Sequence, residues 1–166
     1  MTRTVTLASK ALRIAVFALA GLALAPPAAA QTAEGQSCAG TMTEQLRRFS
    51  EQCLADLVAF VAAQPKAKAR ILSEADKSFI QLTRTPQGIE AEAASKVNFP
   101  LMKPGTEEAL KNLGWQPPDN EAGGYKKRFT TNPGASAATA DDLAKAFAAY
   151  GLARGAAISL TVGTQD

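Results

Sequence analysis

The first 30 residues constrain the fold most, because their pattern is typical of a segment that is removed before folding. Basic residues precede an apolar run at residues 14–25, and prolines and alanines fill residues 26–30. This order predicts a secretory signal peptide that is cleaved near Ala30. The apolar run is shorter than the roughly twenty residues that a transmembrane helix needs. We therefore expect about 136 residues to fold in the periplasm or outside the cell, with no membrane anchor after cleavage.

The charge of the chain depends on the same segment. Arg3, Lys10 and Arg13 account for the whole formal charge of +3, since the chain holds 18 Lys and Arg against 15 Asp and Glu. The rest of the chain is therefore neutral overall. Nucleic-acid binding needs a basic face on the folded domain, so the isoelectric point near 9.0 does not argue for it. We expect a mixed, solvated surface and no nucleic-acid partner.

Two cysteines, Cys38 and Cys53, follow the predicted cleavage site. Disulfides persist in the oxidising compartments that an export signal implies, so we expect these two residues to pair. The bridge would close a loop in the unfolded chain and lower its conformational entropy, which would stabilise the fold by about 3 kcal/mol. A zinc site or a redox pair is the alternative, but the chain has no histidine and the spacing is not C-x-x-C. Residues 31–41 predict a flexible lead, and residues 42–166 suit a single domain.

The first half of the predicted domain combines a helix with a hairpin. Apolar residues recur at helical spacing over residues 43–63, where Thr43 would cap the helix. Residues 66–76 are interpreted as a connector in which Ile71 and Leu72 extend a short helix. Residues 78–84 and 89–97 alternate apolar and polar side chains around the turn at residues 85–88, which predicts a hairpin with one buried face.

The second half alternates helices and strands. Helices are predicted at residues 106–113 and 140–150, with Thr106 capping the first, and strands at residues 125–131 and 156–162. Gly114 and Gly151 stand where helices commonly end. This order favours an α+β fold, in which an antiparallel sheet carries helices packed on one face.

The sequence holds no recognisable catalytic constellation. The absence of histidine removes the Ser-His-Asp and Cys-His classes. The acidic pairs Glu107-Glu108 and Asp141-Asp142 each fall in the first turn of a predicted helix, where they complement the helix dipole. The sequence predicts no metal ligands and no cofactor. An enzyme that uses carboxylates brought together by the fold stays an alternative.

Basic residues cluster only at residues 126–128. On a strand, Lys126 and Arg128 share the face opposite Tyr125 and Phe129. We interpret that face as solvated, and a patch for an anionic partner is the alternative.

Four segments carry a resemblance to a known family: FIQL at 79–82, GIEAE at 88–92, NFPL at 98–101 and LKNLGWQPP at 110–118. Their order resembles the bacterial TY-Chap domains, which group type III secretion chaperone-like and YbjN-like proteins. The resemblance implies a type III secretion chaperone-like, YbjN-like α+β fold that presents a surface to protein partners. It carries over no catalytic residue.

Together these features predict an exported, non-enzymatic, chaperone-like interaction module of the bacterial cell envelope. Its expected partner is a protein or a peptide, and a homodimer is a further arrangement to consider. We expect Trp115, Tyr125, Lys126 and Arg128 to form the partner-binding surface. A small-ligand carrier with a pocket between helix and sheet, and a carboxylate-based periplasmic enzyme, are the alternatives.

Overall fold

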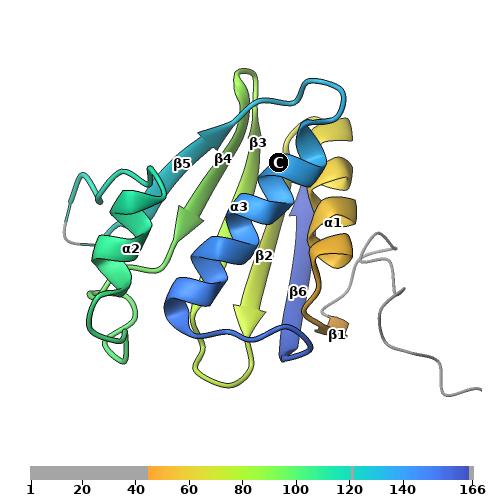
Figure 1. Ribbon diagram of the computed structural model, residues 1–166. Helices are drawn as coiled ribbons and strands as arrows, with labels where there is room; N and C mark the ends of the chain where they lie inside the picture. Colours follow the sequence, from red (N-terminus) through yellow and green to blue (C-terminus); the bar gives the residue numbers. More distant parts are fainter. Residues whose placement is uncertain (1–44, 121, 165–166) are drawn as a thin grey trace, which may run out of the picture. The chain divides into compact units, whose positions relative to one another are not determined.

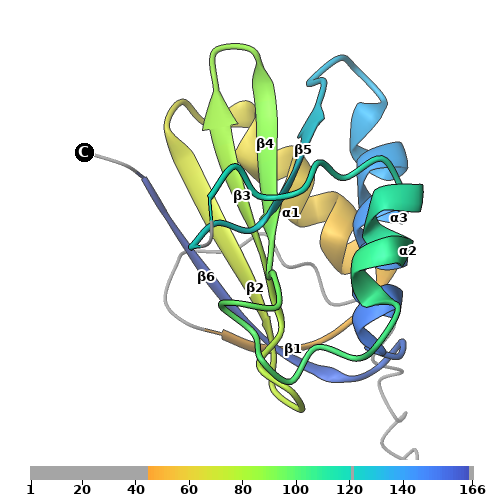
Figure 2. The ribbon, with the colours of Figure 1, turned by 90° about the vertical axis from the view of Figure 1, so that its left-hand side faces the viewer.

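A six-stranded antiparallel sheet organises the chain in a computed structural model, which describes residues 45–120 and 122–164. The elements are β1 (Gln45–Arg48), α1 (Glu51–Ala63), β2 (Ala67–Ser73), β3 (Phe79–Thr85), β4 (Gly88–Ala93), α2 (Thr106–Asn112), β5 (Tyr125–Phe129), α3 (Ala135–Tyr150) and β6 (Ala157–Thr164). The strands lie in the order β1-β6-β2-β3-β4-β5. The helices α1, α2 and α3 pack on one side of the sheet (Figures 1 and 2). The expected α+β fold is confirmed. The predicted signal peptide, the flexible lead and Cys38 lie outside the described residues.

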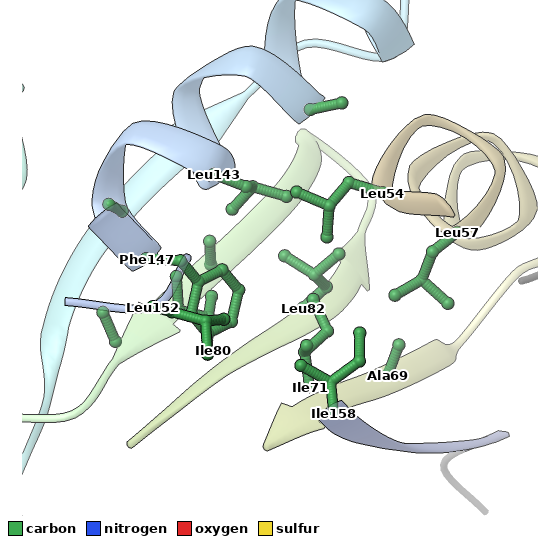
Figure 3. Packing of buried hydrophobic residues seen from close by; sticks show 14 of the residues in the cluster. Leu54, Leu57, Ala69, Ile71, Ile80, Leu82, Leu143, Phe147, Leu152 and Ile158 are labelled. Atoms are coloured by element: carbon green, nitrogen blue, oxygen red, sulfur yellow. The ribbon is translucent and has the colours of Figure 1, made fainter. Parts of the chain in front are cut away.

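The core lies between the inner face of the sheet and the helices α1 and α3. Strand side chains alternate between the two faces, so Ile80 and Leu82 of β3 both point inward. They meet Leu54 of α1 and Phe147 of α3 (Figure 3), and all four side chains are buried. Each large apolar side chain that is fully buried in this way contributes about 1.5–3 kcal/mol.

The predicted helix over residues 43–63 is wrong in its first part. Residues 45–48 form the edge strand β1, which pairs with β6, and the helix begins only at Glu51. The Ser50 hydroxyl accepts a hydrogen bond from the Cys53 backbone nitrogen at 3.1 Å, so Ser50 caps the helix in place of Thr43. Leu46, which the helical pattern placed on the buried face, is 68% exposed.

The predicted connector over residues 66–76 is also wrong, because residues 67–73 form the central strand β2. This strand pairs with β3 on one side and with β6 on the other. Ala67, Ala69 and Ile71 are buried, while the side chains between them are not. Alanine and lysine have high helix propensity, and here the pairing with two neighbouring strands overrides it.

The predicted hairpin is confirmed, with Pro86 and Gln87 as the two residues that join β3 and β4. Gly88 begins β4 with φ +140°, a conformation that other residues rarely adopt. A Cβ atom at this position would stand 2.2 Å from the Phe129 carbonyl oxygen of β5. Glycine is therefore required both by the backbone and by the close approach of the next strand.

The predicted ends of the two later helices are confirmed, whereas the predicted cap of α2 and the predicted start of α3 are wrong. Gly114 has φ +81°, and the Trp115 backbone nitrogen donates to the Leu110 carbonyl at 3.0 Å, which closes α2. Gly105 precedes α2, and Thr106 is not its cap. The Thr106 hydroxyl instead donates to the Ala149 carbonyl of α3 at 2.9 Å, so it ties the two helices together.

Helix α3 begins at Ala135, five residues earlier than expected, so its first turn holds no acidic residue. Asp141 and Asp142 therefore do not complement the helix dipole, whereas Glu107 and Glu108 do lie in the first turn of α2. Asp142 forms an ion pair of 2.6 Å with Lys127 of β5, and the two side chains are only 27% and 20% exposed. The Lys127 ammonium also donates to the Leu113 carbonyl at the end of α2. This lysine thus joins a strand to two helices.

Replacing Gly88 by alanine should lower the free energy of unfolding by about 1–3 kcal/mol, because the substitution forces a strained φ and a contact with Phe129. Urea denaturation monitored by circular dichroism measures the change. Gly163→Ala is the matched control, since a Cβ there meets no atom within 4 Å. The control should change stability by less than about 0.5 kcal/mol. Equal effects of the two substitutions would contradict the explanation.

Asp142→Asn should lower the free energy of unfolding by about 1–2 kcal/mol, because it removes the charge that faces a half-buried ammonium. Asp141→Asn provides a neighbouring control with the same chemical change. Its ion pair with Lys145 is 60% and 57% exposed, so the loss there should stay below about 0.5 kcal/mol. Thermal and urea unfolding of both variants would distinguish the two sites, and a larger loss for Asp141→Asn would refute the assignment.

Candidate functional site

The face of the sheet turned away from the helices, called the outer face below, is left uncovered by α1, α2 and α3 (Figure 2). Its side chains alternate along each strand with the buried ones. They are Leu46 and Arg48 of β1; Lys68, Arg70 and Leu72 of β2; Phe79, Gln81, Thr83 and Thr85 of β3; Glu90 and Glu92 of β4; Lys126 and Arg128 of β5; and Ala157, Ser159 and Thr161 of β6. All six strands therefore contribute to one continuous polar and apolar surface.

The register of the strands sorts these side chains into rows across the sheet. Arg70 stands between Thr161 of β6 and Gln81 of β3. In the next row, Lys68 stands between Gly163 and Thr83. Paired residues of antiparallel strands lie side by side on one face, so each cation of β2 is flanked only by uncharged neighbours.

A hollow of about 320 Å³ lies over this part of the outer face. We call it the cationic hollow, and its lining residues are Lys68, Arg70, Gln81, Thr161, Val162, Gly163 and Thr164. Gly163 contributes no side chain opposite Lys68, which leaves room in that row. The lining residues therefore include two cations, and hydroxyl and amide groups that can donate hydrogen bonds.

The cations of the cationic hollow do not form ion pairs with the acids in their rows, Glu92 and Glu90, which stand on β4 beyond Gln81 and Thr83. None of the ion pairs among residues 45–120 and 122–164 involves Lys68 or Arg70. The Arg70 guanidinium instead lies 4.3 Å from the centre of the Phe79 ring, a cation–π contact that orients it. A positively charged side chain held in this way can receive an anionic group without first breaking an ion pair.

The two basic residues expected at the partner surface do lie on the outer face, on the edge strand β5. Lys126 pairs with Asp119 at 3.1 Å, and Arg128 pairs with Glu90 at 3.4 Å. Their charges are thus already compensated, unlike those of β2. The sequence reasoning missed Lys68 and Arg70 because it interpreted their segment as a connector, although their alternation with Ala67, Ala69 and Ile71 was available as a signal.

The two aromatic residues expected at the partner surface lie in the core. Trp115 is 1% exposed and packs edge-to-face on Phe129, with ring centres 6.4 Å apart. Tyr125 is 3% exposed. Burial raises the pKa of the Tyr125 phenol, and the Glu107 carboxylate adds to the increase. Trp115 and Tyr125 therefore cannot contact a partner while the protein is folded, which corrects the sequence-based expectation.

Cys53 lies on the buried side of α1, as expected. Its sulfur is not a free thiol. The expected partner, Cys38, lies outside the described residues, so the pairing of these two cysteines stays a prediction.

The turn between β2 and β3 holds two carboxylates with shifted pKa values. The Lys77 ammonium, 2.7 Å from Glu74, and the Ser159 hydroxyl both lower the pKa of the Glu74 carboxyl. Burial alone would raise the pKa of Asp76, but the polar groups of Ser73 and Ser78 outweigh it and lower that pKa. The Ser78 hydroxyl donates to Asp76 at 2.8 Å. Both carboxyls are therefore stabilised as anions, the opposite of what a general acid needs.

The lowered pKa of Asp76 predicts that the free energy of unfolding depends on pH in the acid range. Its pKa in the folded state lies below the ordinary value of 3.8, so its contribution is complete above that value and is lost as the pH falls through the folded pKa. Between pH 5 and about pH 2, the free energy of unfolding should therefore fall more steeply for the wild type than for Asp76→Asn. Chemical denaturation at several pH values measures both slopes. Asp56→Asn on α1 serves as the control, and identical slopes for wild type and Asp76→Asn would contradict the role of this carboxyl.

No helix among residues 45–120 and 122–164 has both the length and the apolar character that crossing a bilayer requires. Within the same residues, no three His, Cys, Asp or Glu side chains are grouped so that they could hold a metal ion. Comparisons with protein-family models, with curated proteins and with solved structures found no match.

Proposed function

We propose that this protein is an exported, non-enzymatic interaction module of the bacterial cell envelope, which holds a protein partner against the outer face of its sheet. The observation that carries the proposal is the outer face itself, since the described helices all pack on the opposite side (Figure 2). The signal-peptide pattern of residues 1–30 supports the envelope location. The resemblance to chaperone-like domains supports a role in protein binding, by analogy only.

The outer face suits an extended polypeptide better than a small molecule. Leu46, Leu72 and Phe79 stand in one row across β1, β2 and β3, with Ser159 of β6 between the first two. This row provides apolar contact next to the charged rows of β2. Interfaces commonly combine apolar residues with polar and charged groups in this manner.

The alternative functions have less support. A small-ligand carrier needs a pocket between helix and sheet, but buried side chains such as Leu57, Ile71 and Leu143 fill that space (Figure 3). A carboxylate-based enzyme needs an acid with a raised pKa, and the shifts at Glu74 and Asp76 are in the opposite direction.

Site-specific photo-crosslinking in living cells tests the proposal. A photoreactive amino acid placed at Gln81 or Thr161, on the outer face, should give a discrete adduct. The same amino acid at Ala148, an exposed position of α3, is the control and should give none. An adduct with twice the mass of the chain would identify a second copy as the partner. The proposed surface would be rejected if Ala148 alone gave an adduct, or if neither Gln81 nor Thr161 gave one.

A further inference from the structure

We propose that the cationic hollow binds the carboxylate side chains of an acidic, extended polypeptide, with Lys68 and Arg70 as the anion-binding residues. The proposal rests on the proposed function, because it specifies which chemistry the outer face selects. It adds a ligand class and two residues that the sequence reasoning did not single out.

The spacing of the two cations favours an extended ligand. Lys68 and Arg70 are two positions apart on β2, so their side chains leave the same face of the sheet about 6.6 Å apart along the strand. Side chains at alternate positions of an extended peptide have the same separation. A peptide laid along β2 with acidic residues at positions i and i+2 can therefore place one carboxylate over each cation.

The surroundings of the two cations favour a carboxylate as the group that is bound. Thr161 and Gln81 flank Arg70 and offer hydroxyl and amide hydrogens. A guanidinium can donate two parallel hydrogen bonds to one carboxylate. The contact with Phe79 already holds the Arg70 guanidinium in position, which reduces the ordering that binding would require.

The contrast with β5 argues that the hollow is more than a solvated basic face. Lys126 and Arg128 occupy the same two rows on the same face, and each pairs with an acidic residue. No acidic side chain lines the cationic hollow. The positive charge of β2 is thus left available, whereas the positive charge of β5 is neutralised by the protein's own carboxylates.

The experiment uses protein purified from cells that express the full chain. The main probe is a peptide with blocked ends in which glutamate and serine alternate. A second peptide has the same composition but places its glutamates in adjacent pairs, and inorganic phosphate is the third probe. Isothermal titration calorimetry at low and at physiological salt measures each affinity.

The alternating peptide should bind most tightly, and K68Q/R70Q should weaken its binding at least about tenfold. The control K126Q/R128Q removes the same charge from the same face and should change the affinity by less than about twofold, since those cations are already paired. If the double variant does not fold, the single variants K68Q and R70Q should each show a smaller loss.

Four results would overturn the proposal. Equal losses in K68Q/R70Q and K126Q/R128Q would mean that only the net charge matters. Equal binding of the two peptides would remove the argument from spacing, and displacement of the peptide by inorganic phosphate at lower concentration would make the hollow a small-anion site. Photo-crosslinks from Gln81 that persist unchanged in K68Q/R70Q would reject the acidic ligand while leaving the proposed function intact.

Discussion

The alternation of side chains along β2 is the constraint on which the rest of the structure depends. This strand lies inside the sheet and pairs with β3 and β6, so its residues must face either the helices or the solvent. Ala67 and Ala69 are small on the inner face, and Ile71 fills the core beneath α1 (Figure 3). The same two-residue period places Lys68 and Arg70 together on the opposite side. One strand therefore supplies part of the core and the whole charge of the hollow.

The parts of the fold that sequence reasoning predicted correctly are those in which local chemistry decides the conformation. Gly88 requires a special φ, and Gly114 and Gly151 close helices through contacts only a few residues away. The two strands that were missed, β1 and β2, both pair with β6 near the other end of the chain. Such a distant partner is not recorded locally, so residues 45–48 were assigned to a helix from their apolar spacing and residues 66–76 to a connector, although β2 does alternate between buried and less buried side chains.

The candidate site was predictable only in part for the same reason. Lys126 and Arg128 were placed correctly, because Tyr125 and Phe129 stand an even number of positions apart on β5 and therefore share one face, which leaves Lys126 and Arg128 on the other. Trp115 and Tyr125 were misplaced, since large aromatic residues are favoured both in interfaces and in cores and their type does not distinguish the two. Lys68 and Arg70 could be found only after β2 was known to be a strand, because only a strand brings residues two positions apart onto one face.

The position of β6 has a consequence for the order of events in folding. It follows every other described strand in the sequence, yet it lies between β1 and β2. Until β6 has been synthesised, β1 and β2 lack the strand with which they pair on that side. The sheet therefore cannot assemble in sequence order, from β1 onwards, during synthesis. The strands β2 to β5 can pair with one another before then, but β1 and one edge of β2 stay unpaired until β6 has been made. Late pairing of this kind would be compatible with the proposed export, in which the chain crosses a membrane before it folds.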